Sequence, residues 1–425
     1  MFEPGAAFAD SLDGQDPLRH FRDQFAMPVP RNRLETTYLD GDSLGLQSQA
    51  ARDMVITELD KWARDGALAH FETEQPWVEY HQYLAQPMSR IVGALPSEVI
   101  AMNTLTVNLH LMMVSFYRPS ASRYKILVED HAFPSDHYAV ESQIRAHGLD
   151  PAEALITVTP RPEEETLRED DLLAAIQEHG SELALVLLPG VHYYTGQVLP
   201  MPELVAAARA VGAAIGFDLA HAVGNIELSL HDWGPDFAVW CTYKYLNAGP
   251  GAIGGAFVHE RHHGDPDRIR YHGWCGHDRS TRFEMDTVFK PIPTAEAWLV
   301  SNSPILAMAP ILGSLDVFDR AGGMAPLRAK SELMIRYMDY LVDTRLAGLV
   351  EPITPRDLEE RGCQHSLRIM DPSVCGQNVY ERLMNADVVC GWRYPDAIRV
   401  APVPLYNTFA DIQRFAAILE EILTG

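Results

Sequence analysis

The chain has 425 residues, of which 47% are apolar and 22% charged, a composition typical of a folded protein with two or three domains. Its 34 basic and 58 acidic residues give a formal net charge of −24, which disfavours binding to nucleic acids. Five cysteines without CxxC spacing predict reduced thiols and a cytoplasmic protein, and no apolar run is long enough for a membrane helix.

Residues 1–45 predict an irregular N-terminal arm with one short helix at 17–25. The first 16 residues are acidic and interrupted by Gly and Pro, unlike a signal peptide. Helical and strand patterns then alternate, and they predict helices at 50–66, 163–180 and 202–212 and strands at 123–130, 183–190, 213–222 and 237–244. Short apolar strands between helices are typical of a largely parallel sheet, so we expect an α/β domain over 46–305.

The pattern changes after residue 305. Two long helices are predicted at 303–322 and 330–346. Strands at 365–370 and 398–404 then mix with helices at 378–386 and 408–425. Residues 306–425 therefore predict a second, smaller α+β domain.

Two chemically active residues follow apolar strands. Asp218 and Lys244 both lie near carboxyl ends of predicted strands, where α/β proteins bind their ligands. Burial favours the neutral form of a lysine amine, which can form a Schiff base with a carbonyl. Pyridoxal 5′-phosphate (PLP) uses such a lysine and needs a carboxylate facing its ring nitrogen. Lys244 and Asp218 therefore predict a PLP site, with His221 against the ring; the alternative is a surface lysine and a helix-capping aspartate.

Other segments offer groups for the rest of this cofactor. Leu105 and Thr106 begin a predicted helix, and backbone N–H groups at a helix start bind phosphate, although a plain helix start would look the same. Phe133 could stack on the ring, Asp136 could bond a ring substituent, and Tyr243 could reach the phosphate or act as an acid or base.

Arg399 lies within an otherwise apolar predicted strand. Its guanidinium is suited to the carboxylate of an amino-acid substrate, although an edge-strand arginine facing solvent would give the same pattern. The histidines in residues 261–264 have no matching carboxylate spacing, so we interpret them as a polar loop and expect no metal.

Taken together, these motifs resemble those of kynureninases, which are fold-type-I PLP enzymes. The resemblance spans nearly the whole chain and rests on GDSLGLQ (41–47), MNTLTVNLHLMMVSFYRP (102–119), the segments at 123–149, 190–197, 216–251 and 273–286, SNSPIL (301–306) and RVAPVPLYN (399–407). It implies a mostly parallel seven-stranded sheet, a smaller C-terminal domain and a homodimer with shared active sites. It also implies hydrolysis of the Cβ–Cγ bond of L-kynurenine or 3-hydroxy-L-kynurenine to an anthranilate and L-alanine, a step of tryptophan catabolism and NAD biosynthesis.

The resemblance also implies a role for each matching residue. Lys244 would hold the cofactor and abstract the α-proton, Asp218 would face the ring nitrogen, and Tyr243 would act as acid or base in later steps. Arg399 would bind the substrate carboxylate. The remaining cofactor contacts would be Leu105, Thr106, Phe133, Asp136 and His221, with Trp274 and Asn302 from the neighbouring subunit. Ser43, His70 and Asn302 would contact the aryl ring and its 3-hydroxyl, which predicts a preference for 3-hydroxykynurenine because a hydroxyl-binding site is left unpaired by the other substrate.

The chain departs from the usual pattern of the family at four places. Asp42 replaces an asparagine, Glu74 and Gln75 replace a Lys-Arg pair, Cys275 replaces a phenylalanine, and Pro189 replaces a serine near the phosphate. The first three fall in segments expected near the aryl end of the substrate. A substituted kynurenine from a specialised biosynthetic pathway therefore stays open as the substrate, as does another fold-type-I reaction such as transamination or a β-lyase reaction.

Overall fold

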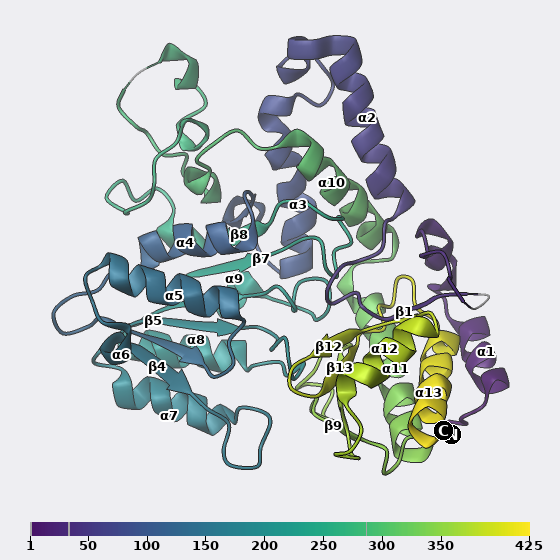
Figure 1. Cartoon of the computed structure of the whole chain (residues 1–425). Coiled ribbons are helices and arrows are strands. Elements are labelled where there is room, and N and C mark those ends of the chain that lie inside the picture. Colours follow the sequence, from purple (N-terminus) through teal and green to yellow (C-terminus); the bar gives the residue numbers. More distant parts are fainter. Residues whose placement is uncertain (1, 33–34, 286) are drawn as a thin grey trace.

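The computed structural model describes residues 2–32, 35–285 and 287–425, and its larger part is built around one seven-stranded sheet (Figure 1). The strands are β2 (Val99–Ala101), β3 (Lys125–Glu129), β4 (Leu155–Val158), β5 (Leu183–Pro189), β6 (Ala214–Asp218), β7 (Phe237–Trp240) and β8 (Gly255–Val258). Their order is β2-β8-β7-β6-β5-β3-β4, and only β8 runs antiparallel to its neighbours. The predicted mostly parallel sheet is confirmed.

Apolar residues on both faces of the strands explain the three-layer arrangement. Leu185 and Leu187 of β5 pack in one core cluster, and Val186 and Leu188 pack in another, because successive side chains point to opposite faces. The helices over the first face are α4 (Leu105–Phe116) and α5 (Pro134–Ala146). Those over the second are α3 (Tyr80–Val92), α7 (Glu169–His179) and α8 (Met201–Val211). The one-turn helix α6 (Pro151–Ala154) lies between α5 and β4, and α9 (Leu230–Trp233) lies between β6 and β7. The helix α2 (Gln49–Asp65) packs against α10 (Ile305–Arg320).

Several predicted boundaries were wrong. The strand expected at 237–244 ends at Trp240, just after the last residue of its parallel partner, β6, pairs with Val239. Lys244 therefore lies in the turn that follows the strand. The helix expected from 163 begins only at Glu169, because Glu163 has a positive φ of 66°, which a helix does not allow. The short helix expected at 17–25 is a 3₁₀ helix, Arg19–Gln24.

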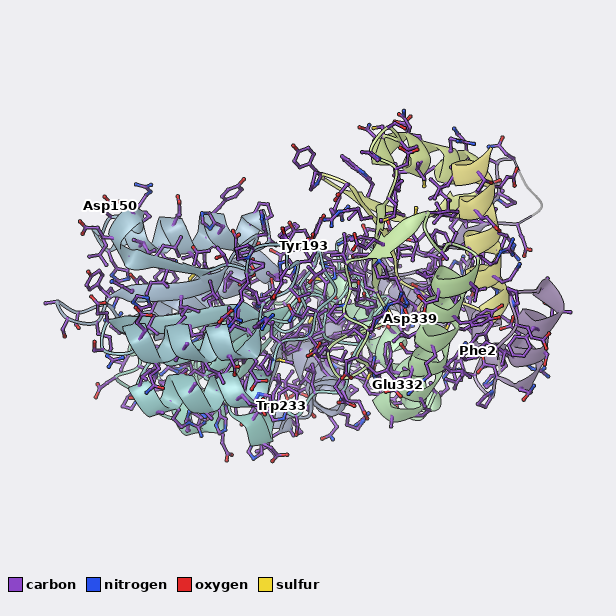
Figure 2. The ribbon with its side chains drawn as sticks, turned by 90° about the horizontal axis from the view of Figure 1, so that it is seen from below. Phe2, Asp150, Tyr193, Trp233, Glu332 and Asp339 are labelled. Carbon is purple, nitrogen blue, oxygen red and sulfur yellow. The ribbon has the colours of Figure 1, made fainter. Side chains whose placement is uncertain are left out.

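The C-terminal part contains a second, antiparallel sheet of order β12-β13-β10-β9. Its strands are β9 (Val350–Pro352), β10 (His365–Ile369), β12 (Gly391–Arg393) and β13 (Ala397–Val400), and its helices are α11 (Met324–Thr344), α12 (Gly376–Asn385) and α13 (Phe409–Thr424). The N-terminal arm joins this part: α1 (Ala6–Gln15) packs on α13, and β1 (Thr37–Tyr38) pairs with β11 (Val388–Val389). Phe2, labelled in Figure 2, packs against Tyr337 of α11 with the ring centroids 5.6 Å apart. The predicted domain boundaries at 45/46 and 305/306 stay predictions.

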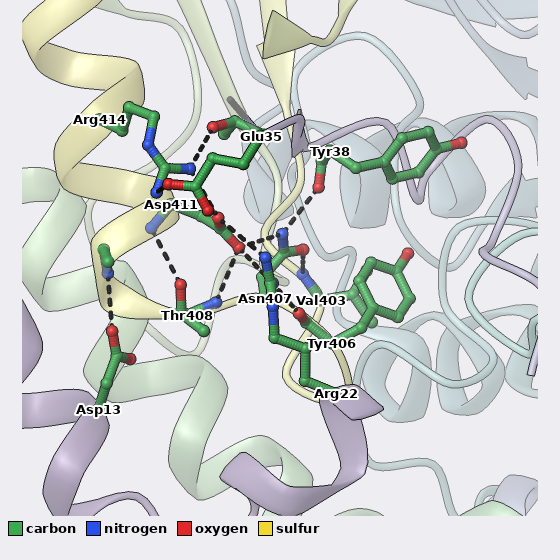
Figure 3. Close-up of polar contacts among 12 residues, drawn as sticks. Asp13, Arg22, Glu35, Tyr38, Val403, Tyr406, Asn407, Thr408, Asp411 and Arg414 are labelled. Carbon is green, nitrogen blue, oxygen red and sulfur yellow. Dashed lines mark hydrogen bonds and ion pairs between the residues drawn. The ribbon is translucent and has the colours of Figure 1, made fainter. Parts of the chain in front are cut away.

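A polar network fixes the arm to the segment between β13 and α13 (Figure 3). Asn407 donates to the carbonyl of Tyr38 at 2.7 Å and accepts from the backbone N–H of Val403 at 2.8 Å. Asp411, in the first turn of α13, pairs with Arg22 at 2.7 Å. As a result, residues 38–42 run alongside the end of β13. None of the helices in the described parts of the chain has both the length and the apolar character needed to cross a membrane.

Candidate active site

A cavity of about 340 Å³ lies at the carboxyl ends of β3, β5 and β6 and beside the turn after β7. The predicted site residues that line it are Ser43, Leu105, Thr106, Phe133, Asp136, Asp218, His221, Tyr243, Lys244 and Arg399. They come from segments more than 350 residues apart in sequence, and both parts of the molecule contribute to one site.

Lys244 contacts His221 directly. The Nζ of Lys244 lies 2.8 Å from Nε2 of His221. Burial, and then the positive charge of Lys244, lowers the pKa of His221 well below its ordinary value, so the imidazole is neutral and can accept this hydrogen bond. Its Nδ1 has no hydrogen-bond partner among the described residues and is left for a bound group.

Three carboxyl groups gather at the strand ends. Burial, and then the negative charge of Asp218, raises the pKa of Asp136 well above its ordinary value. Burial also raises the pKa of Glu129 to about 8, with a smaller contribution from Asp218. Asp218 accepts a 2.7 Å hydrogen bond from the backbone N–H of Ala220. Asp218 therefore lies beside two carboxyl groups whose pKa values are raised by burial and by its own proximity.

The start of α4 faces the same cavity. Thr104 precedes this helix without capping it through its side chain, and Leu105 and Thr106 line the cavity. The hydroxyl of Thr106 lies 2.6 Å from that of Ser135, at the start of α5. Two helix starts and two hydroxyls thus offer donors to an anion. Tyr243 lies nearby, and burial raises the pKa of its phenol, which therefore stays protonated.

Arg399 is held in an unexpected contact. Its Nη1 donates to the carbonyl of Tyr193 at 2.6 Å, and Tyr193 lies where the large sheet meets the C-terminal part (Figure 2). Its Nη2 lies 2.7 Å from Oδ2 of Asp42, and the two side chains are 1% and 0% exposed. Asp42 lines the same cavity as Ser43, and its place near the aryl end of the substrate stays a prediction; its contact with Arg399 was not predicted, because it arises where the loop carrying Asp42 runs beside β13.

The other predicted residues lie elsewhere in the chain. His70, Trp274 and Asn302 line a separate cavity of about 240 Å³, which shares no lining residue with the first. Cys275 lines it too, and its thiol donates to Oδ1 of Asn302 at 3.0 Å. Glu74 and Gln75 are exposed, whereas Pro189 lines the first cavity. Within one chain, therefore, the residues expected at the aryl ring divide between two places.

The polar loop expected at 261–264 is used for structure. His262 contacts Asp236 at 2.7 Å, and His263 contacts the carbonyl of Val258 at 3.0 Å. Within the described ranges, the group that brings metal-ligand atoms together is Glu98, His231 and His259. The Glu98 carboxylate already accepts from the backbone N–H groups of Leu95 and Glu260 and contacts His231, so this group is a hydrogen-bonded cluster within the protein.

Comparison with known proteins shows the family and the fold of this chain. The profile described as "Kynureninase C-terminal domain" matches residues 327–419, and "Aminotransferase class-V" matches residues 83–279. A protein named kynureninase from Myxococcus xanthus is 51% identical over 99% of this chain and 98% of its own. Another, from Xanthomonas oryzae pv. oryzae (strain PXO99A), is 53% identical over 97% of both chains. The chain belongs to the kynureninase family.

Solved structures with the same fold include the apo cysteine desulfurase of Thermococcus onnurineus NA1 (TM-score 0.76, 16% identity, 98% of both chains) and a C-DES mutant with glycine linked to PLP (TM-score 0.76, 17% identity, 91% of this chain and 97% of that one). The predicted fold-type-I architecture is confirmed.

In this kynureninase-family chain, sequence reasoning missed several residues that line the cavity: Glu129, Ser135, His192, Tyr193 and Arg393. Glu129 could have been found, since it is a charged residue at the end of an apolar strand. Arg393 could not, because it reaches the cavity only through the pairing of β12 with β13.

Proposed function

We propose that this protein is a PLP-dependent kynureninase, which hydrolyses the Cβ–Cγ bond of L-kynurenine or 3-hydroxy-L-kynurenine to an anthranilate and L-alanine. The observation that carries the proposal is the meeting of Lys244, His221, Asp218 and Arg399 in one cavity of a kynureninase-family chain. Together they supply an amine, a neutral imidazole, a carboxylate and a carboxylate-binding guanidinium.

The residues of the cavity fit the cofactor. Nδ1 of His221 and Oδ1 of Asp136 are buried and lack hydrogen-bond partners among the described residues, as expected for groups that meet a ligand. Leu105 and Thr106 at the start of α4 are suited to its phosphate, Phe133 to its ring and Asp218 to its ring nitrogen. When bound, PLP supplies an electron sink for bonds broken at the substrate's Cα and Cβ.

The protein's own groups would handle the protons. Lys244, in contact with neutral His221, is the base for the α-proton of the substrate. Tyr243 keeps its proton because burial raises its pKa, so it acts first as an acid toward the developing charge in later steps. Arg399 binds and orients the substrate carboxylate, which leaves the aryl group to extend toward Ser43.

The protein is proposed to act as a homodimer with shared active sites. The supporting observation is that Ser43 and His70, both expected at the aryl ring, line different cavities of one chain. A second subunit that brings His70, Trp274 and Asn302 to the first cavity would unite them. Large apolar side chains around the second cavity, such as Phe71 and Phe283, are exposed in the single chain and would be covered. Five free cysteines, four of them buried, fit the proposed cytoplasmic location.

A product analysis tests the proposal. The PLP-loaded protein would be incubated with L-kynurenine and with 3-hydroxy-L-kynurenine, and alanine and the aryl product would be quantified. We expect alanine from both, with the larger kcat/KM for the hydroxylated substrate, and none from Lys244→Ala. An α-keto acid in place of alanine would overturn hydrolysis in favour of transamination. No product from either substrate would direct the search to ring-substituted kynurenines.

A further inference from the structure

Asp42 and Arg399 form the basis of an inference that extends the proposed function. The family resemblance implies an asparagine at position 42, so Asp42 places an additional carboxyl group beside Arg399. Although their side chains lie 2.7 Å apart, both oxygens of Asp42 and both Nε and Nη2 of Arg399 lack aligned hydrogen-bond partners among the described residues. Buried polar atoms that lack aligned hydrogen bonds can bind a ligand in place of their present contact.

The surroundings of Asp42 contain a second carboxyl group, Asp40. The backbone of Asp40 bridges to Ala401 directly after β13, which brings the residue beside Arg399. A Cβ built on Gly391 would lie 3.2 Å from Oδ1 of Asp40 and 3.3 Å from Nε of Arg399, so both atoms approach the same point. Burial, and then the charge of Asp42, raises the pKa of Asp40 to about 7. Arg393, a second guanidinium that lines the cavity, opposes that shift.

The other titratable groups that face this pair carry no charge near neutral pH. Burial raises the pKa of each neighbouring phenol and thiol: Tyr38, Tyr193, Tyr245, Cys363, Tyr380, Cys390 and Tyr406. His221, across the cavity, is neutral for the reason given above. The cluster of Asp40, Asp42, Arg393 and Arg399 therefore has a net charge of zero when both carboxyl groups are ionised.

We infer that Asp42 couples binding of the substrate carboxylate at Arg399 to the uptake of one proton from solvent by the Asp40–Asp42 pair. The inference rests on the proposed role of Arg399. A carboxylate that enters a balanced, buried cluster leaves one uncompensated negative charge, which is unfavourable unless a carboxyl group is neutralised. Below pH 7 the pair already holds a proton, and the carboxylate binds without uptake. Above pH 7 the proton must be taken up, so binding weakens as the pH rises, by up to about tenfold per pH unit.

The test uses the PLP-loaded full-length protein and two ligands, L-alanine and L-alaninamide, which differ in the carboxylate. Titration calorimetry at pH 8 in buffers of different ionisation enthalpy gives the protons taken up per ligand bound. We expect the wild type to take up about one more proton than Asp42→Asn with alanine, and the same number with alaninamide. The dissociation constant of alanine should also rise above pH 7 more steeply in the wild type. Asp40→Asn should behave like Asp42→Asn, since uptake needs both carboxyl groups.

Two further variants separate the possible failures. Asp170→Asn makes the same charge change at an exposed position in the first turn of α7 and should match the wild type. Arg399→Gln should lose the preference for alanine over alaninamide. If that preference survives, the proposed role of Arg399 is wrong. If it is lost, but the wild type and both Asn variants take up equal numbers of protons, Asp42 does not couple binding to protonation and the inference alone is overturned.

Discussion

At the residue scale, the buried carboxyl group of Glu129 makes the stability of the folded chain depend on pH. Its carboxyl group has a pKa of about 8 in the folded chain, raised chiefly by burial, against 4.5 when unshifted. The folded state therefore binds the proton more tightly, and the stability from the neutral form is lost as the pH rises from 4.5 through 8. In the wild type, this ionisation lowers the free energy of unfolding by on the order of 3 to 5 kcal/mol between these pH values, and we predict that Glu129→Gln removes this decrease. The melting temperature of the cofactor-free variant should exceed that of the wild type at pH 8.5 by more than at pH 5. An equal difference at both values would contradict it.

The contact of Cys275 with Asn302 gives a second prediction at this scale, for the proposed preference for 3-hydroxykynurenine. Its thiol donates to the amide oxygen of Asn302, and both residues line the second cavity. We predict that Cys275→Ala raises KM for 3-hydroxykynurenine about fivefold, because a net hydrogen bond of about 1 kcal/mol is lost. Cys275→Ser keeps a donor and is the matched control, with a KM near that of the wild type. Steady-state kinetics with both substrates would measure it, and equal KM values in the two variants would show that the thiol does not position Asn302.

The residues that sequence reasoning found and missed differ in one physical respect. Asp218 ends the apolar strand β6 and Lys244 lies in the turn after the apolar strand β7, so the strand pattern and the chemistry of the side chain suffice to predict them. The partner of Arg399 could not be predicted in the same way. Asp42 reaches it through tertiary pairing of residues 38–42 with β13, which leaves no local pattern in the sequence.

At the scale of elements, the loop that carries Asp42 depends on one close approach. A Cβ on Gly41 would overlap with the hydroxyl of Tyr406 and with Cγ2 of Val403, both in the buried segment after β13. We predict that Gly41→Ala lowers the melting temperature by several degrees, because the added methyl group overlaps with its neighbours. It should also raise KM for the kynurenine substrates, because the loop must move away from Arg399. Combining it with Tyr406→Phe, which removes one of the two overlapping groups, should restore part of both. Thermal melts and kinetics of the single and double variants would test this, and a fully stable single variant would contradict it.

Element types followed from periodicity, whereas their ends depended on tertiary partners. The helices expected at 50–66 and 202–212 match α2 and α8 to within a residue at each end, because amphipathic spacing and a glycine stop are local signals. The end of β7 was misplaced because a strand ends where its neighbour ends, and apolar residues continue past that point. The late start of α7 follows a turn in which Arg161 pairs with Asp171 at 2.7 Å, a contact between segments that periodicity does not report.

At the scale of the whole molecule, the family resemblance predicted the sheet and the two-part architecture, but the position of His70 emerged only from the structure. Ser43 and His70 are 27 residues apart in sequence and were assigned to one ring, yet α2 extends between them and carries His70 to the second cavity. The length of a 17-residue helix, about 25 Å, makes this separation unavoidable within one chain. A shared site is the arrangement in which both residues can meet one substrate.

Subunit mixing tests that arrangement. Lys244→Ala and Asn302→Ala protomers, each inactive or nearly so alone, would be mixed under conditions that exchange subunits. A mixed dimer then has one intact site, with Lys244 from one protomer and Asn302 from the other. Random exchange should restore about a quarter of the wild-type activity, because half of the dimers are mixed and each has one working site of two. Trp274→Ala mixed with Asn302→Ala is the matched control: both residues enter from the same side of the interface, so every site keeps one defect and activity should not exceed the mean of the two parents. No restoration in the test pair despite confirmed exchange would mean that each chain builds its site alone. Restoration in the control would mean that Trp274 and Asn302 reach a given site from different protomers.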